Sequence, residues 1–318
     1  DYFRLTRDLV FNDDVIVDGK FNAAKEANFI KYYGLGQERV FSDDEFSGTF
    51  DGGGHTISGI YGLRSCFLGK TDGAIIQNLT IKDSYVIPDN NRLFEVYNTS
   101  FFIGDADNTT ISNCHVVNCV ADIIQHTYYS FGCIVGGGLK CTVTNCTVSD
   151  CTINGIMSYP EANYINILYI GGLFGQIGGT IKNCHSSGTI NVTGNVFHCI
   201  GGFSATFLGD ACYDCTSRMN IVIDKLQNTG FNDVYYIGGF SGESTSTSKF
   251  YRCASLGDIS IGNASSTITS EKPVYISGFG NAKERAEYYD CVRSGKILFN
   301  GKVESPYISI NGFALGYK

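Results

Sequence analysis

Three groups of neighbouring acidic residues are the first candidates for chemistry in this sequence. They are Asp13 with Asp14, Asp43 and Asp44 with Glu45, and Asp105 with Asp107. Two carboxylates ~5 to 10 Å apart across a sugar ring can hydrolyse a glycosidic bond. Acidic residues in polar loops are more often solvated turn residues, and none of these groups recurs on adjacent repeats of the chain. We therefore predict no catalytic residue, and a polysaccharide lyase or glycoside hydrolase remains an alternative.

The histidines, the next candidates for catalysis or metal binding, follow no metal-site pattern. They are His55, His115, His126, His185 and His198. None has the spacing to cysteine or carboxylate residues that metal ligands usually have. His115 and His185 are expected to face outward, whereas His126 and His198 stand beside aromatic residues. We predict no metal ion and no other cofactor.

Glycine-rich segments such as IGGLFG would suit a phosphate-binding loop if they occurred once, but they recur. Related segments place a glycine before each later repeat, at Gly172, Gly202, Gly239 and Gly278. Segments such as TISNC and TIKNC also recur every 31 to 38 residues. They define one equivalent position, which we call the mark, at Leu79, Cys114, Cys146, Cys184, Cys215, Cys253 and Cys291. Both patterns indicate a structural repeat rather than a ligand loop.

Each repeat consists of short alternating segments rich in β-branched and aromatic residues, which are typical of strands. One short helix is expected, at Asn22–Ile30. A single unit cannot bury its apolar side, but stacked units can share one core. We predict an all-β fold, a right-handed parallel β-helix of about seven to nine turns. Residues 1–66 would form an N-terminal capping region and first turn, and residues 67–318 one continuous elongated domain of repeats.

Equivalent positions in the repeats predict which side chains are buried. The residues three before each mark are mostly apolar and should face the core: Ile76, Ile111, Val143, Ile181, Cys212, Phe250 and Tyr288. The residues just before the marks should adopt left-handed backbone at a bend, with the first four as an asparagine ladder: Asn78, Asn113, Asn145, Asn183, Asp214, Arg252 and Asp290. The repeat glycines should approach other backbone closely. The residues after them should lie in the core: Leu173, Phe203, Phe240 and Phe279.

The chain has 13 cysteines, and those at the marks should form a mostly reduced, buried stack. Neighbouring turns of a parallel sheet lie ~4.8 Å apart, a separation that disulfides also accept, so distance does not exclude bridges. The odd number of cysteines requires at least one unpaired thiol in a monomer.

Three segments together carry a resemblance to a known family. They are DYFRLTRDLVFND (Asp1–Asp13), FSGTFDGGGHTISGIYG (Phe46–Gly62) and GGLFGQIGGTIKNCHSSGTINVTG (Gly171–Gly194). The chain resembles, over nearly its whole length, the GLUG-motif family of secreted and surface-anchored microbial proteins. The resemblance implies a β-helix in an extracellular, often adhesive or stalk-like protein. Some members are attached to a zinc protease of immunoglobulin A, but this chain contains no His-Glu-x-x-His, so that activity is not implied here.

Composition restricts the partners. The net charge is −8 and the 23 Lys and Arg residues are scattered, so nucleic acid is not an expected partner. The sequence contains no stretch of about 18 apolar residues, so direct membrane insertion is not expected. The chain begins at Asp1 rather than Met, which suggests a processed mature chain or an excised segment.

Sequons for N-linked sugars occur at Asn78, Asn98, Asn108, Asn145, Asn191 and Asn263. They would be used only if the source is a eukaryote. Asn78 and Asn145 also belong to the expected ladder, in which a buried amide could not carry a glycan.

Tyrosines in TYY (127–129), VYY (234–236) and EYY (287–289) are expected to point outward at alternate positions. Exposed tyrosines can stack on sugars or pack against proteins, although strand propensity alone also explains them. We predict a non-catalytic, extracellular, structural or adhesive module of a secreted or cell-surface protein, with host or matrix glycans or proteins as partners. A third hypothesis is a filament subunit that self-associates end to end through open strand edges.

Overall fold

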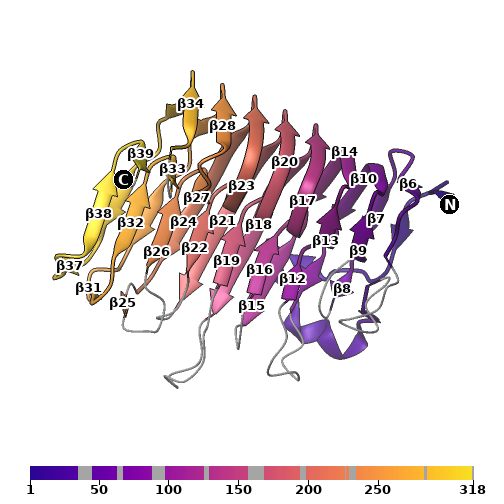
Figure 1. Cartoon of the computed structure of the whole chain (residues 1–318). Coiled ribbons are helices and arrows are strands. Elements are labelled where there is room, and N and C mark those ends of the chain that lie inside the picture. The colour runs from indigo at the N-terminus through magenta and orange to yellow at the C-terminus, as the bar shows by residue number, and fades with distance from the viewer. Residues whose placement is uncertain are drawn as a thin grey trace.

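The computed structural model is a parallel β-solenoid that runs along one axis from the N-terminal to the C-terminal turn (Figure 1). The structure describes residues 1–34, 45–62, 67–87, 97–124, 129–156, 168–193, 198–225, 227–228, 234–282 and 285–316. The winding amounts to about 6 turns, slightly fewer than the seven to nine expected. The predicted all-β parallel solenoid is confirmed.

Each complete turn contributes strands to five columns, named I to V in the order in which the chain visits them. Column I is a separate sheet: β12 (Tyr97–Thr99), β16 (Tyr129–Gly132), β19 (Leu168–Gly171), β22 (Cys199–Gly201), β26 (Tyr235–Gly238), β32 (Val274–Ser277) and β38 (Ile308–Asn311). Column II consists of β9 (Leu68–Asp72), β13 (Ile103–Asp107), the first parts of β17 (Val135–Thr144), β20 (Phe174–Lys182) and β23 (Ser204–Tyr213), then β27 (Ser241–Ser244), β33 (Gly280–Ala282) and β39 (Ala314–Gly316).

Columns III to V complete the turn. Column III consists of β1 (Tyr2–Arg4), β6 (Thr49–Asp51), the first parts of β10 (Ile75–Lys82) and β14 (Thr110–Val117), the last parts of β17, β20 and β23, then β28 (Ser248–Tyr251) and β34 (Glu287–Tyr289). Column IV consists of β2 (Leu9–Val10), β7 (Thr56–Ser58), the last parts of β10 and β14, the first parts of β18 (Thr147–Ile156), β21 (His185–Thr193) and β24 (Thr216–Ile223), then β29 (Ala254–Ser255) and β35 (Val292–Arg293). Column V consists of β5 (Lys31–Tyr32), β8 (Tyr61–Gly62), β11 (Tyr85–Val86), β15 (Val120–Ile124), the last parts of β18, β21 and β24, then β30 (Ile259–Ile261) and β36 (Ile297–Phe299). The short strands β25 (Gln227–Asn228), β31 (Thr267–Ser270) and β37 (Lys302–Val303) pair separately.

The segment between β2 and β5 packs against the side of column V. It contains the antiparallel hairpin of β3 (Ile16–Val17) and β4 (Lys20–Phe21), followed by the 3-10 helix η1 (Ala23–Asn28). The ring of Phe21 stacks on that of Tyr85, with centroids 3.8 Å apart. The expected helix at Asn22–Ile30 is therefore present as a short 3-10 helix, which covers a lateral apolar patch.

The strand register aligns the residues that precede the marks by three. These residues are successive Cα partners along column III: Ile76, Ile111, Val143, Ile181, Cys212, Phe250 and Tyr288. Only Tyr288, in the last turn, is not fully buried. Because equivalent residues stack on each other in this way, the core consists of side-chain ladders that run parallel to the axis.

Columns III and IV meet at a sharp bend just before each mark. The seven residues at this bend, Asn78 to Asp290, have φ angles between 51° and 56°. Asn and Asp tolerate this left-handed conformation better than most residues, so the predicted bend is confirmed. Asp83, Asn118 and Asp150 form a similar bend between columns IV and V, with φ between 49° and 55°.

The asparagines at the first bend interact along the axis. Asn113 Nδ2 donates to Asn78 Oδ1 at 3.1 Å, and Asn183 Nδ2 donates to Asn145 Oδ1 at 2.7 Å. The expectation that this ladder is buried is wrong: Asn113, Asn145 and Asn183 are exposed. A left-handed residue at an outer bend points its side chain into solvent, so the ladder forms on the surface.

The repeat glycines lie at the corner between columns I and II. A Cβ atom on Gly202 or Gly239 would lie 2.3 Å from the carbonyl oxygen of the equivalent glycine one turn on. From the opposite wall, Ser186 Oγ donates to Gly202 O at 2.8 Å. The side chains of Leu173, Phe203, Phe240 and Phe279 follow these glycines and are fully buried. The glycines therefore let opposite walls of the solenoid touch.

Candidate functional site

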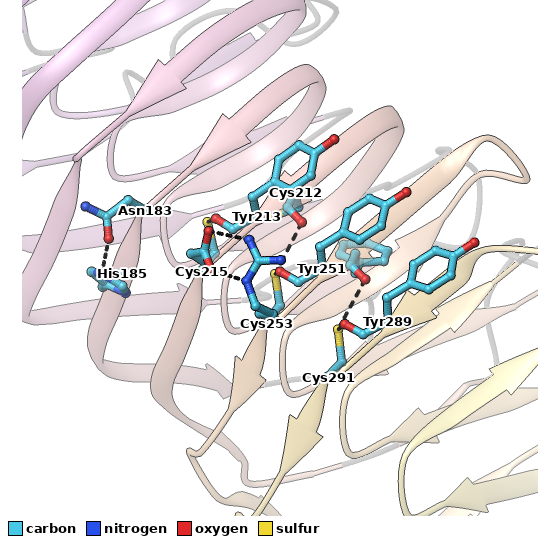
Figure 2. A network of polar contacts seen from close by, with 12 residues as sticks. Asn183, His185, Cys212, Tyr213, Cys215, Tyr251, Cys253, Tyr289 and Cys291 are labelled. Carbon is cyan, nitrogen blue, oxygen red and sulfur yellow. Dashed lines mark hydrogen bonds and ion pairs between the residues drawn. The ribbon is translucent and has the colours of Figure 1, made fainter.

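A regular surface feature is a stack of tyrosines on the outer face of column III. Tyr213 and Tyr251 have ring centroids 4.8 Å apart, and Tyr251 and Tyr289 4.7 Å apart. Each follows a core residue, so strand alternation directs it outward. Figure 2 shows the three rings in parallel with their hydroxyls pointing the same way. We call Tyr213, Tyr251 and Tyr289 the tyrosine ladder.

The geometry of the ladder determines what it can bind. The ring planes of Tyr251 and Tyr289 differ by only 5°, so the two rings cover each other's faces. Sugars stack on open aromatic faces, and the two end rings, Tyr213 and Tyr289, each have one face that no other ladder ring covers. All three rings also offer edges and hydroxyls. The ladder is thus suited to repeated, individually weak polar contacts along the axis.

Charged residues flank the tyrosine ladder. Arg252 donates from Nε to Asp214 Oδ1 at 2.6 Å and from Nη2 to Asp214 Oδ2 at 2.8 Å. This bidentate contact lowers the pKa of the Asp214 carboxyl. Tyr289 donates to Glu287 Oε2 at 2.6 Å, and that hydrogen bond raises the pKa of the Tyr289 phenol. The ladder therefore carries fixed polar groups of both signs.

The expectation that a tyrosine of VYY faces outward is wrong. Tyr235 is in the core, and Tyr236, on the other side of β26, is only 6% exposed. The Tyr236 ring packs edge-on against His198 at 5.7 Å and stacks with Tyr275 at 5.7 Å. Burial raises the pKa of Tyr236. Tyr289 of EYY is 44% exposed, whereas Tyr128 and the side chain of Tyr129 lie outside the described residues.

A charged row occupies the start of column II. Lys70 and Asp105 are Cα partners on adjacent turns, and Lys70 Nζ forms an ion pair with Glu45 Oε1. Asn98 Nδ2 donates to Asp105 Oδ1. Burial raises the pKa of Asp105, against the lowering effect of the Asn98 hydrogen bond. A cation thus stands between two carboxylates, one of which is held partly desolvated.

This row corrects the expectation that no carboxylates face each other on adjacent repeats. Asp72 and Asp107 are direct Cα partners, and Glu45 and Asp105 lie on either side of Lys70. The alignment of the repeats did not predict this arrangement because Glu45 precedes the first mark. An acid with a raised pKa could donate a proton to a glycosidic oxygen. However, the direct ion pair with Lys70 occupies the Glu45 carboxylate that would have to act as its partner.

The other acidic and histidine candidates are scattered. Asp13 is exposed, and Asp14 accepts from Lys25 Nζ at 2.6 Å. Asp43, Asp44 and His126 lie outside the described residues. Within the described ranges, no group of three or more His, Cys, Asp and Glu side chains is arranged to hold a metal ion.

The remaining histidines take part in local contacts. His55 Nδ1 lies 3.2 Å from Asp8 Oδ1. His115 Nδ1 lies 2.7 Å from Thr147 Oγ1 and His185 Nε2 lies 3.3 Å from Asn183 Oδ1. Both lie on column IV, and burial lowers the pKa of His115. Each of these contacts joins one histidine to one neighbouring side chain on the surface of the solenoid.

The sequons occupy three kinds of site. Asn108, Asn145 and Asn263 are exposed. Asn78 donates to Asp51 Oδ1 at 3.0 Å and Asn191 to Asn154 Oδ1 at 2.9 Å. The side-chain amide of Asn98 donates a hydrogen bond to Asp105 Oδ1. The exposed group offers the most room for a glycan.

Both ends of the solenoid present strand edges. In the described part of the chain, β34, β35 and β36 pair only with the preceding turn, and β1, β2 and β5 only with the following one. Large apolar side chains are exposed at both ends, including Tyr2, Val10, Val292 and Ile310. The two sets of strands are opposite ends of columns III, IV and V, and Figure 1 shows the N-terminal turn and β34 at opposite ends of the molecule.

Comparison with known proteins identifies one motif. Residues 167–191 match the family model described as the GLUG motif. No match was found among curated proteins or among solved structures. In the described residues, no helix has the length and apolar character needed to cross a membrane. The motif covers β19, the glycine corner at Gly172, β20 and most of β21. It therefore corresponds to most of one solenoid turn, and the predicted resemblance is confirmed there: the chain carries a GLUG motif.

Proposed function

We propose that this chain is a non-catalytic, extracellular, structural or adhesive module of a secreted or cell-surface protein. The observation that carries the proposal is the outward-facing tyrosine ladder, in which Tyr213 and Tyr251 are half-buried and Tyr289 is exposed, and which continues in register over three turns beside the Asp214–Arg252 pair. Contacts repeated along an axis are weak singly and useful together. Host or matrix glycans and proteins with repeated polar groups are the expected partners.

A binding comparison tests the ladder. The folded chain would be applied to immobilised host glycans and matrix proteins, together with Tyr251→Ala, Tyr251→Phe and a Tyr213→Ala/Tyr251→Ala/Tyr289→Ala variant. We expect graded loss, with Tyr251→Phe reporting the hydroxyl alone. Tyr307→Ala, at a 50% exposed residue away from the ladder, is the matched control. Full binding by the triple variant, with an unchanged circular dichroism spectrum, would contradict a role for this surface.

The enzyme alternative rests on Asp105, whose raised pKa suits a general acid. Incubation with pectins, alginates and host glycans would be followed by assays for reducing ends and unsaturated products. Under our proposal neither product forms. Product formation by the wild type that is lost in Asp105→Asn would replace the adhesive function by a polysaccharide-processing one.

A filament subunit is the second candidate function, and the matching ends of columns III to V favour it. Translation of one copy along the axis would place β34, β35 and β36 beside β1, β2 and β5 of the next, all parallel and in the same order. Exposed strand edges readily accept further strands. Sedimentation velocity over a range of concentrations should then show growing assemblies that Val292→Lys, at an exposed residue of β35, reduces. A single monomeric species at every concentration would exclude this function.

A further inference from the structure

The cysteines at the marks form a column of thiols at the bend between columns III and IV. The amide of Cys146 donates to Cys184 Sγ at 3.5 Å, and the amide of Cys184 donates to Cys215 Sγ at 3.3 Å. Each sulfur therefore reaches the neighbouring turn. Adjacent parallel strands lie ~4.8 Å apart, within the Cα separations that disulfides accept. All six mark cysteines are free thiols.

The last member of the column differs from the others in its access to solvent. Cys291 is half-buried, whereas the other mark cysteines are buried. Figure 2 shows Cys253 and Cys291 on successive turns, beside Tyr251 and Tyr289. Cys291 Sγ donates to Phe250 O and to Tyr289 O, each at 3.4 Å, so its sulfur is directed back toward the turn that carries Cys253. A soluble reagent would therefore meet Cys291 first.

We propose that Cys253 and Cys291 form a reversible disulfide when the folded chain meets a low-molecular-weight disulfide. The Cys291 thiolate attacks one sulfur of the reagent and releases one thiolate, which leaves a mixed disulfide on Cys291. The Cys253 thiolate then attacks the Cys291 sulfur, forms the Cys253–Cys291 bond and releases the second thiolate. Two protein thiols are oxidised, and one reagent disulfide is reduced to two thiols.

The position in the last turn explains why this pair should react and the interior pairs should not. In-register parallel strands hold equivalent Cβ atoms ~4.8 Å apart, which is longer than the ~3.8 Å typical of a disulfide. Closing the bond therefore requires one turn to move toward the other. In the described structure, the strands on either side of Cys291, β34 and β35, pair only with β28 and β29 of the preceding turn. Interior turns are fixed from both sides.

The environment of Cys291 sets the pH dependence. The hydrogen bond with Cys253 and partial burial raise the pKa of the Cys291 thiol. Because the thiolate is the reacting form, the first step should be slow at neutral pH and accelerate as the pH rises into the alkaline range.

The test uses the full chain and glutathione disulfide. After incubation under native conditions, remaining thiols are alkylated, and non-reduced peptides are examined by mass spectrometry. We expect a peptide pair linked through Cys253 and Cys291, lighter by two hydrogens and separated by dithiothreitol. Cys253→Ser should instead accumulate a glutathione adduct on Cys291, and Cys291→Ser should form neither product. Cys114→Ser, at the other end of the column, should react like the wild type.

Rates give a second measurement that does not depend on any substitution. In the folded wild type, Cys291 should react at least about tenfold faster than any other mark cysteine, because reactivity follows access. A stable glutathione adduct on Cys291 of the wild type without a bridge would overturn the proposal. Bridging among interior mark cysteines at the same rate, or no reaction of Cys291 at alkaline pH, would also overturn it.

Discussion

Ser255 Oγ donates a 2.8 Å hydrogen bond to the carbonyl oxygen of Gly278, so column IV touches the glycine corner of the next turn across the core. The equivalent glycine one turn earlier, Gly239, is equally confined. A Cβ atom there would lie 2.3 Å from Gly278 O and 2.4 Å from Ser255 Oγ. Neither wall can retreat without disturbing its own strand ladder.

We therefore expect Gly239→Ala to lower the free energy of unfolding by ~2 to 3 kcal/mol, as overpacking of a tight core does. Urea titration followed by circular dichroism measures the change. The control is Gly312→Ala, where no atom lies within 4 Å of the added Cβ. Equal stability of the two variants would show that the corner is not tightly packed.

Phe240 lies in the middle of the aromatic core stack, with ring centroids 4.4 Å from Phe203 and 4.8 Å from Phe279. Phe240→Ala should lower the free energy of unfolding by ~3 to 5 kcal/mol, because it leaves a cavity that stacked rings cannot fill. Thermal and urea unfolding check this value. A loss no larger than that of Tyr307→Ala, at an exposed residue, would contradict the burial of Phe240.

Asn183 adopts φ of 53° at the bend before its mark. Asn183→Val should cost ~1 to 2 kcal/mol of unfolding free energy, since left-handed backbone brings a branched Cβ into contact with the carbonyl. Asn183→Gly keeps the backbone free of that contact and loses two side-chain contacts, the 2.7 Å hydrogen bond to Asn145 and the 3.3 Å contact with His185 Nε2. The glycine variant should therefore be the more stable of the two, and the reverse order would mean that the side-chain ladder dominates at this bend.

Asp105 makes stability depend on pH, because burial raises its pKa in the folded chain. The folded state then binds the proton more tightly than the unfolded state, whose pKa is ~4. The contribution of Asp105 to stability is present below that pKa and is lost as the pH rises through the higher folded-state value. The stability of Asp105→Asn relative to wild type should consequently increase between acidic and neutral pH.

Urea midpoints of both proteins at several pH values measure this difference. Asp107→Asn removes the same charge two residues along the strand and serves as the control. A difference between Asp105→Asn and wild type that stays constant with pH would indicate that Asp105 is solvated like an ordinary turn residue.

The spacing of the marks allowed the solenoid and its ladders to be predicted, because each turn must bring Ile111, Val143 and Ile181 back to one column. Alternation along a strand also separates inner from outer residues. Alternation does not predict which side chains pack on the outer face. The burial of Tyr236 by His198 and Tyr275 was therefore not predicted.

The charged row was missed for a different reason. Lys70 and Asp105 are 35 residues apart, within the repeat period, but they lie outside the two recurrent segments that defined the alignment. Glu45 reaches Lys70 through a turn that precedes the first mark. Contacts between polar side chains of different types leave no periodic signal in the sequence. They can be recognised only when the strand register is known.

The lengths of the strand pairings have a mechanical consequence. Hydrogen bonds between turns run along the axis, so a pulling force along the molecule would be shared by all columns at each step. In columns IV and V, β18 and β21 form one continuous pairing from Thr147 to Ile156, whereas the last turn has two short pairings, β29 with β35 at Ala254 and Ser255 and β30 with β36 at Ile259 to Ile261. Under tension the chain should separate at its C-terminal turns first, while the long central strands bear the load.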